Sequence, residues 1–152
     1  MKILEVMSKE TICVDLKATD KKGVLDELAA PVATLAGASQ EELVKVLMER
    51  ERLGSTGIGG GIGIPHGKLK SIEDLILGFG LSRRGVDFES MDGRPTHIFF
   101  LLLTPESSAG LHLKLLARIS RLLKNEEFKN QLMQASTADD IIETIQERDE
   151  SF

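Results

Sequence analysis

The chain has 152 residues, 41% of them hydrophobic and 28% charged, which is typical of a single globular domain over residues 1–152. Its net charge of −5 argues against a general nucleic-acid-binding protein, because such a protein needs a basic face that displaces counterions from phosphates. No apolar run approaches the about 18 residues of a membrane span, and the N-terminus lacks the apolar core of a signal peptide. We therefore expect a cytoplasmic protein without direct membrane insertion, and the single cysteine, Cys13, suits a reducing compartment.

The chain is predicted to begin with a strand and a helix. Partial alternation of apolar and polar residues indicates a short strand over residues 11–16. Thr19 and Asp20 can cap a helix whose apolar residues recur at helical spacing as far as Gly37. Pro31 lies inside this pattern and should kink or divide the helix, because proline cannot donate the backbone hydrogen bond.

A second helix is predicted from a capping-box pattern, with Ser39 at the N-cap and Glu42 three positions later. This helix ends near Gly54, and its last turn carries Arg50 and Arg52. Cations are favourable at the carboxyl end of a helix, which is a sufficient structural reason for either arginine.

The middle of the chain is predicted to supply the rest of a sheet, with strands over residues 62–66, 75–81, 86–88 and 97–103. Asp92 and Gly93 are a typical turn pair between the last two. The uninterrupted apolar run of residues 98–103 predicts burial on both faces of its strand, and hence helices above and below the sheet.

Three helices are predicted after the strands. Residues 111–123 repeat apolar side chains every 3.6 residues, Asn125 can cap the next helix, and Thr137 begins the last. The predicted fold is therefore a single-domain α/β protein in which a mixed β-sheet lies between helices.

A glycine-rich segment is the most unusual feature of the sequence. Seven of the fourteen glycines fall within residues 54–67, next to His66, which lies between Pro65 and Gly67. Glycine loses more backbone entropy on folding than any other residue, so this density indicates unusual dihedrals or a close approach to a ligand. We interpret His66 as the reactive group and the glycines as a cradle for the group it carries.

The glycine-rich segment does not match a nucleotide-binding motif. The Walker pattern requires glycine where Ile62 stands and Ser or Thr where Leu69 stands, and the dinucleotide-binding spacing also fails. The segment follows a helix and leads into a strand, which is opposite to the order in both motifs. No nucleotide cofactor is expected.

Histidine chemistry is the better hypothesis for this segment. A neutral imidazole is nucleophilic, and its reference pKa of about 6.5 leaves much of the side chain neutral at cellular pH. A phosphoryl group on His66 would need hydrogen-bond donors for three oxygens. Glycine amides, the hydroxyls of Ser55 and Thr56 and the guanidinium of Arg50 would supply them.

The other two histidines carry weaker signals. His112 lies in the first turn of the helix at 111–123, where its position alone favours a boundary histidine bonded to a carbonyl. His97 begins an apolar strand and is interpreted as structural. No pair of residues has the spacing of metal ligands, so no metal site is predicted.

With these residues laid out, the chain resembles the EIIA components of the bacterial phosphoenolpyruvate-dependent sugar phosphotransferase system, in the fructose/mannitol class and closest to the nitrogen-related members. The motif RERLGSTGIG, continued through GIGIPHGK, occupies residues 50–68. A second match is the helix that begins with His112 and Leu113. The resemblance covers nearly the whole chain.

The resemblance implies that His66 accepts a phosphoryl group from the phosphohistidine of HPr or its nitrogen-branch analogue. It implies that His112 lies close to the phosphorylated ring and stabilises it, which reverses the interpretation from position alone. Arg50 matches an arginine expected near the phosphate. Ser55 and Thr56 match a hydroxyl pair, and the sequence does not decide which of the two contacts phosphate. No metal or other cofactor is implied.

Partners are expected to bind around His66. An exposed apolar rim should dock the donor, and Leu53, Ile58 and Leu69 are the predicted members. The downstream partner is either an EIIB protein, as in sugar transport, or a regulatory target that distinguishes the phosphorylated from the unphosphorylated form. The sequence leaves both open.

Two other functions remain in competition. One is a non-phosphorylated binding module that keeps the fold and uses the glycine segment for a small anion or a partner protein. The histidine pair and Arg50 argue against it, since such a module has no need of them. The other is a hydrolase with a His–His acid–base pair, which lacks an obvious nucleophile with an orienting acid.

Overall fold

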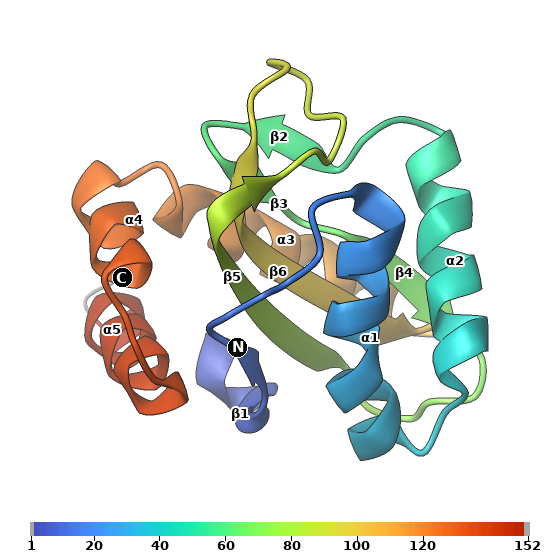
Figure 1. Ribbon diagram of the computed structural model, residues 1–152. Coiled ribbons are helices and arrows are strands. Elements are labelled where there is room, and N and C mark those ends of the chain that lie inside the picture. The colour runs from blue at the N-terminus through green and yellow to red at the C-terminus, as the bar shows by residue number, and fades with distance from the viewer. Residues whose placement is uncertain (1, 151–152) are drawn as a thin grey trace.

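A six-stranded mixed sheet lies between two layers of helices in the computed structural model, which describes residues 2–150 (Figure 1). The strands are β1 (Met7–Cys13), β2 (Gly57–Gly59), β3 (Ile62–Gly63), β4 (His66–Leu69), β5 (Ile76–Val86) and β6 (Thr96–Pro105). The helices are η1 (Ile3–Glu5), α1 (Lys21–Ala36), α2 (Gln40–Arg52), α3 (Ala109–Leu122), α4 (Glu126–Met133) and α5 (Ala138–Glu150). The strand order is β1-β5-β6-β3-β2, and β4 pairs with β6 further along the same edge as β3.

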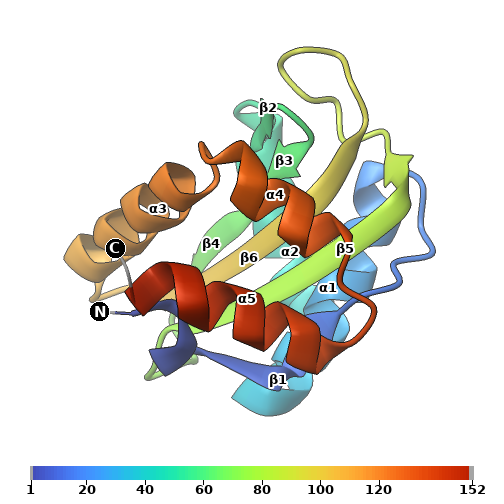
Figure 2. The ribbon, with the colours of Figure 1, turned by 90° about the vertical axis from the view of Figure 1, so that its left-hand side faces the viewer.

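Strand β6 separates the two hydrophobic cores, as its apolar run predicts. Ile98, Phe100 and Leu102 join the core beneath α3, α4 and α5, whereas Phe99 and Leu101 join the core beneath α1 and α2. Figure 2 shows α3, α4 and α5 on one face of the sheet, with α1 and α2 behind it. The predicted fold class, a mixed sheet sandwiched between helices in one domain, is confirmed.

The ends of the first two helices follow the predicted signals, and Pro31 does not divide the first helix. The Asp20 carboxylate accepts a hydrogen bond from Gly23 N at 2.8 Å, and Gly37 ends α1 in the left-handed conformation at φ 67°. The helix runs undivided through Pro31. Leu28 and Val32, on either side of the proline, are both buried against the sheet, and this packing outweighs the lost backbone hydrogen bond.

Helix α2 shows half of its predicted capping box. The Ser39 hydroxyl accepts a hydrogen bond from Glu42 N at 3.3 Å, and this bond opens the helix.

Three strand predictions need correction. The first strand is Met7–Cys13 rather than residues 11–16, and it pairs in parallel with β5. Three consecutive polar residues at positions 8–10 hide the start of this strand from an alternation pattern. Residues 75–81 and 86–88 are not two strands, because β5 continues through residues 82–85 and ends at Val86. Residues 62–66 are not one strand, because β3 ends at Gly63 and His66 begins β4 instead of ending the earlier strand.

A buried ion pair joins the start of α1 to the end of α2. Lys21 Nζ lies 3.0 Å from Glu51 Oε1 and 5.0 Å from the centroid of the Phe88 ring. Both oxygens of Glu51 also accept hydrogen bonds from Thr56, one from the backbone N–H and one from the hydroxyl. The loop after α2 is therefore fixed to both helices from the interior of the protein.

This ion pair predicts that Lys21→Met is strongly destabilising. Removing one partner of a buried pair leaves the Glu51 carboxylate without a counter-charge, and such changes cost about 3–5 kcal/mol. The neighbouring Lys22→Met is a matched control, since Lys22 is exposed and, within residues 2–150, pairs only with Asp26 on the surface. Its expected cost is below about 0.5 kcal/mol. Urea unfolding of the two variants measures the difference, and equal stabilities would contradict the interpretation.

In the described part of the chain, no helix combines the length and the apolar character that crossing a membrane requires.

Candidate functional site

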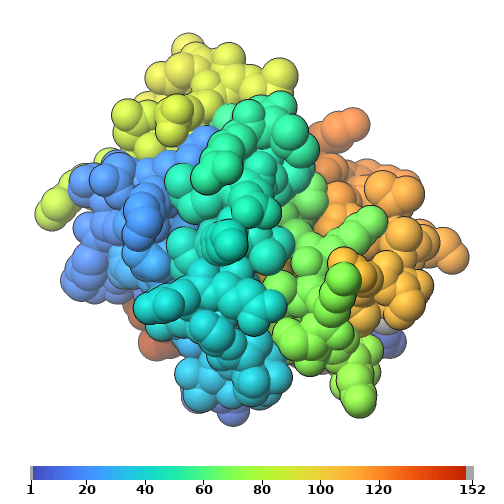
Figure 3. Space-filling model, turned by 90° about the vertical axis from the view of Figure 1, so that its right-hand side faces the viewer, coloured from blue at the N-terminus to red at the C-terminus, as the bar shows by residue number. Residues whose placement is uncertain are grey.

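A cavity of about 530 Å³ opens at the edge of the sheet, where β4 passes between α2 and α3. Figure 3 shows the green surface of β4 between the cyan surface of α2 and the orange surface of α3. The lining side chains come from these three elements: Val46, Glu49, Arg50 and Leu53 from α2, His66, Gly67 and Lys68 from β4, and Ala109, His112, Leu113 and Leu116 from α3.

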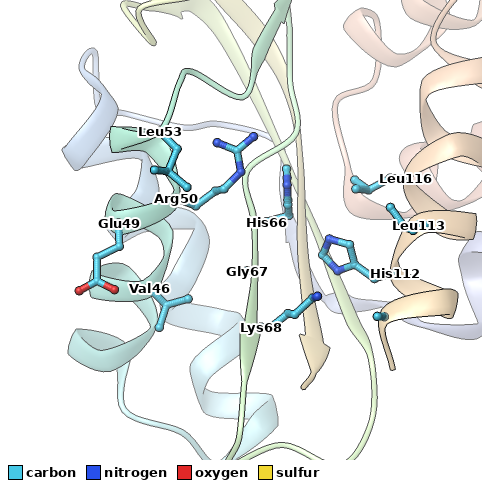
Figure 4. A pocket seen from close by; sticks show the side chains of 11 residues that line it. Val46, Glu49, Arg50, Leu53, His66, Gly67, Lys68, His112, Leu113 and Leu116 are labelled. Atoms are coloured by element: carbon cyan, nitrogen blue, oxygen red, sulfur yellow. The ribbon is translucent and has the colours of Figure 1, made fainter. Parts of the chain in front are cut away.

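The pairing of β4 with β6 brings the two histidines together. In the parallel register, His66 lies opposite Leu102 and Lys68 lies opposite Thr104. Residues two apart on a strand share a face, and Leu102 belongs to the core beneath α3. His66 and Lys68 therefore project towards α3, whose first turn carries His112. Figure 4 shows the three side chains converging on the cavity.

Gly67 faces the opposite side of β4 and lets α2 approach closely. A Cβ atom at this position would lie only 2.7 Å from Cγ1 of Val46, a stiff β-branched side chain on α2. Only glycine allows this contact without moving the helix. One turn further along α2, Arg50 reaches the cavity beside His66.

The backbone fixes which nitrogen of His66 is free. Nδ1 lies 2.7 Å from the carbonyl oxygen of Ile64, which can only accept a hydrogen bond. In the neutral ring Nδ1 therefore carries the proton and Nε2 carries the lone pair. Partial burial lowers the pKa of His66 below its usual value, and the positive charge of Arg50 lowers it further against the opposing effect of the Ile64 carbonyl. The ring is thus neutral at pH 7, with a nucleophilic Nε2.

His112 is buried against His66 rather than lying at a boundary. The two ring centroids are 5.2 Å apart, in an edge-to-face arrangement with an interplanar angle of 62°. Burial lowers the pKa of His112 to about 4, and the nearby His66 and Lys68 contribute to the shift. Its Nδ1 lies 2.6 Å from the hydroxyl oxygen of Thr104.

Arg50 and Arg52 have different surroundings, although both lie in the last turn of α2. Arg50 lines the cavity, and its Nη1 donates a hydrogen bond to the carbonyl of Gly54 at 2.9 Å. Arg52 is exposed and is not among the lining residues. Of these two arginines, Arg50 alone therefore faces the cavity that holds His66.

Ser55 and Thr56 do not line the cavity. The Ser55 hydroxyl donates to the carbonyl of Phe88 at 2.9 Å, and the Thr56 hydroxyl is bonded to Glu51 in the buried cluster. Their role as phosphate ligands stays a prediction. In this conformation both hydroxyls brace the loop that follows α2.

The glycine-rich hairpin of β2 and β3 lies beside the cavity and is not its floor. Its turn is anchored by Asp92, which accepts from Gly60 N at 3.0 Å, and by Lys129, which donates to the Gly60 carbonyl at 3.3 Å. Of the seven glycines in residues 54–67, only Gly67 lines the cavity. The expectation of a glycine cradle around His66 is thus wrong for six of the seven. They permit positive φ angles, as at Gly59 to Gly61, or close packing.

Sequence reasoning gave no role at the site to six of the lining residues: Val46, Glu49, Lys68, Ala109, Leu113 and Leu116. Two of these, Lys68 and Leu113, bear directly on its charge and its exposed rim. Lys68 projects into the cavity because it lies two positions after His66 on the same strand, and within residues 2–150 it forms no ion pair. Its strand position is the signal that could have found it. Leu113 follows His112 on α3 and is 67% exposed.

The predicted apolar rim around His66 is right in one of its three members. Leu53 lines the cavity and is 85% exposed. Ile58 is exposed but does not line the cavity, and Leu69 is buried in the core beneath α1 and α2. The observed rim consists of Leu53 and Leu113 on opposite sides of the opening, with Val46 and Leu116 partly buried between them.

The remaining candidate ligands lie apart from the cavity. His97 bonds through Nδ1 to the carbonyl of Ser82 at 2.8 Å and is not a lining residue. Among residues 2–150, no group of three or more His, Cys, Asp or Glu side chains is arranged to hold a metal ion.

Comparison with known proteins identifies the family. The family model "Phosphoenolpyruvate-dependent sugar phosphotransferase system, EIIA 2" matches residues 5–148. The chain belongs to this EIIA family. The nitrogen regulatory protein of Bradyrhizobium diazoefficiens is 42% identical over 145 residues, which are 95% of each chain. The fructose-specific EIIABC component of Bacillus subtilis is 38% identical over 98% of this chain, but the match spans only 24% of that longer protein.

A solved structure supports the same assignment. The crystal structure of the nitrogen regulatory protein IIA-Ntr from Neisseria meningitidis matches with a TM-score of 0.88 and 29% identity, covering 93% of this chain and 97% of that one. The predicted resemblance is confirmed: the chain is a member of the EIIA-type phosphocarrier family, which includes nitrogen-regulatory and sugar-specific proteins.

The low pKa of His112 predicts a pH-dependent contribution to the stability of this EIIA domain. Between about pH 6.5 and about pH 4, His112 is protonated in the unfolded chain but neutral in the folded protein. The free energy of unfolding therefore falls as the pH falls through this range. The loss amounts to up to about 3 kcal/mol. Urea unfolding at several pH values should show a shallower slope for His112→Gln than for the wild type, and identical slopes would contradict the assignment.

Proposed function

We propose that this EIIA-family protein is a phosphohistidine carrier that accepts a phosphoryl group on Nε2 of His66. The observation that supports this most directly is the histidine pair. A neutral His66, with Nδ1 bonded to Ile64 and Nε2 free, lies against His112 in an open cavity that also holds two cationic side chains. This arrangement supplies a nucleophile and positive charge for the group it receives.

In the proposed reaction, Nε2 of His66 attacks the phosphorus atom of the donor's phosphohistidine in line with the bond that breaks. The N–P bond to the donor breaks as the new Nε2–P bond forms, and the donor imidazole keeps the electron pair of the broken bond. No other reactant is needed. One N–P bond replaces another, so positioning and electrostatics supply most of the catalysis.

Three side chains around His66 are suited to bind the transferred group. Arg50 can present two N–H groups to the phosphoryl oxygens, provided that its guanidinium leaves the Gly54 carbonyl. Lys68, which forms no ion pair with the other described residues, adds a second positive charge, and Figure 4 shows its side chain extending towards His112. His112 can donate one N–H from the side of α3. Lys68 and His112 lie in the cavity before the reaction, which lowers the cost of reorganising these two donors.

The donor and the downstream partner are proposed to bind over the same opening. The donor is HPr or its nitrogen-branch analogue, and it would bury the exposed side chains of Leu53 and Leu113 around the two histidines that exchange the phosphoryl group. The downstream partner is either an EIIB protein or a regulatory target. Relatives of both kinds exist, since one is named a nitrogen regulatory protein and another an EIIABC component.

Phosphoryl transfer from phosphoenolpyruvate through Enzyme I and HPr, or the nitrogen-branch analogues of both, tests the carrier function. We expect the intact mass of the wild type to increase by one acid-labile phosphoryl group and that of His66→Gln to stay unchanged, because the variant lacks the nucleophile. Arg50→Gln should accept the group at least about tenfold more slowly, since it loses a charge-assisted contact.

The control for this experiment is Arg52→Gln, which removes a charge from the same helical turn outside the cavity and should leave the rate unchanged. A folded wild type that takes up no phosphoryl group from either type of donor would refute the carrier function. The alternative, a binding module without phosphorylation, would then account for the site.

The docking surface makes a separate prediction. Leu113→Asp places a charge in the proposed interface, so kcat/KM for transfer from the donor should fall about tenfold or more while the folded structure is kept. Leu35→Asp is the matched control, because Leu35 is 52% exposed but lies outside the cavity. Stopped reactions at varied donor concentration measure both. Equal values for the two variants would exclude Leu113 from the interface.

A further inference from the structure

Thr104 lies directly behind His112 and is the side chain that orients it. Its side chain on β6 is fully buried, and its hydroxyl oxygen is 2.6 Å from Nδ1 of His112. The register of the sheet places Thr104 opposite Lys68, on the face of β6 that α3 covers. Neither the glycine motif nor the helix that carries His112 includes this residue.

The hydrogen bond between the two side chains has one direction that satisfies both. His112 is neutral at pH 7 and carries a single ring proton, because its pKa is lowered to about 4. If that proton were on Nδ1, it would be donated to Thr104, and the threonine O–H would need another acceptor. Within residues 2–150, the hydroxyl has no second hydrogen-bond partner. If the threonine donates instead, no buried polar group is left unpaired.

The same direction also matches the state of His66. The Ile64 carbonyl holds the proton of His66 on Nδ1, so Nε2 of that ring bears a lone pair. With Thr104 donating to Nδ1 of His112, the other nitrogen of His112, Nε2, carries the N–H. The opposite arrangement would give both rings an unprotonated Nε2 in a cavity where their centroids are 5.2 Å apart. An N–H on His112 is also what a phosphoryl group on His66 would require.

We propose that Thr104 is a positioning residue: its hydroxyl donates a hydrogen bond to Nδ1 of His112 and thereby keeps the ring proton of His112 on Nε2. The consequence for phosphoryl transfer rests on the proposed carrier function: the N–H of His112 is aimed at the oxygens of the group on His66 before that group arrives. Thr104 contacts neither substrate nor product and acts through His112.

Imidazole ¹⁵N NMR of the unphosphorylated protein tests the assignment without any donor. We expect His112 of the wild type to be protonated on Nε2. In Thr104→Val, which keeps the shape but removes the hydroxyl, the Nδ1-protonated form should become substantially populated. Thr104→Ser keeps the hydroxyl and should restore the wild-type form. A wild-type His112 protonated on Nδ1, or a tautomer unchanged in Thr104→Val, would overturn the proposal.

Thr96→Val is the matched control for this series. Thr96 is a second fully buried threonine on β6, and its hydroxyl has no hydrogen-bond partner among the described residues. This variant should leave the tautomer of His112 unchanged. If it shifts the tautomer as much as Thr104→Val does, general disturbance of β6 is the cause and the proposal fails.

The functional arm measures transfer and the lifetime of the phosphorylated protein. Transfer to His66 should slow about tenfold in Thr104→Val and recover in Thr104→Ser, and the phosphoprotein should hydrolyse faster in the valine variant. Transfer at the wild-type rate despite a shifted tautomer would overturn the functional consequence. If the wild type accepts no phosphoryl group while the NMR result holds, the carrier function fails and the role of Thr104 in orienting His112 stands.

Discussion

The parallel pairing of β4 with β6 is the constraint on which the site depends. This short edge strand lies between two helices from distant parts of the sequence, and its register determines which face each residue presents. A shift of one residue would turn His66 towards α2 and Gly67 towards α3. His66 would then lose His112, and a side chain would meet Val46 where there is now none. The alternation of histidine and glycine on β4 therefore serves both neighbouring helices.

Buried polar contacts behind the cavity explain how a loop rich in glycine can hold a defined shape. Glu51 is bonded to Lys21 on one helix and to Thr56 in the loop, so the end of α2 and the loop move together. Arg50 is the neighbour of Glu51 and bonds to Gly54, within the same anchored segment. The entropy cost of the glycines is offset by contacts that lie outside the cavity. Rigidity at the site thus originates in residues that no bound group would touch.

The sequence predicts the layers of this fold better than it predicts the contents of the site. Burial of residues 98–103 on both faces of β6 follows from composition alone, because an unbroken apolar run leaves no polar face. The contact of His66 with His112 does not follow from spacing, since the two residues are 46 positions apart and are brought together only by the sheet register and α3. The family resemblance was what predicted this contact. Lys68, Leu113 and Thr104 were missed because each depends on which face its element presents. The glycine-rich segment was wrongly interpreted as a cradle because close packing and ligand contact both favour a high density of glycine in a sequence.

The geometry of the opening limits how this EIIA protein can work with its partners. His66 is reached between α2 and α3, and the same apolar side chains, Leu53 and Leu113, border that opening. A donor and a downstream partner that both need to approach His66 would compete for this surface, so they would bind in turn rather than together. A phosphoryl group on His66 would add negative charge in the centre of that surface, beside Arg50 and Lys68. A partner with a charged group facing His66 would then bind the two forms with different affinity. One cavity would therefore suffice for either proposed role, transfer to an EIIB protein or regulation by phosphorylation state, and the partner's surface would decide between them.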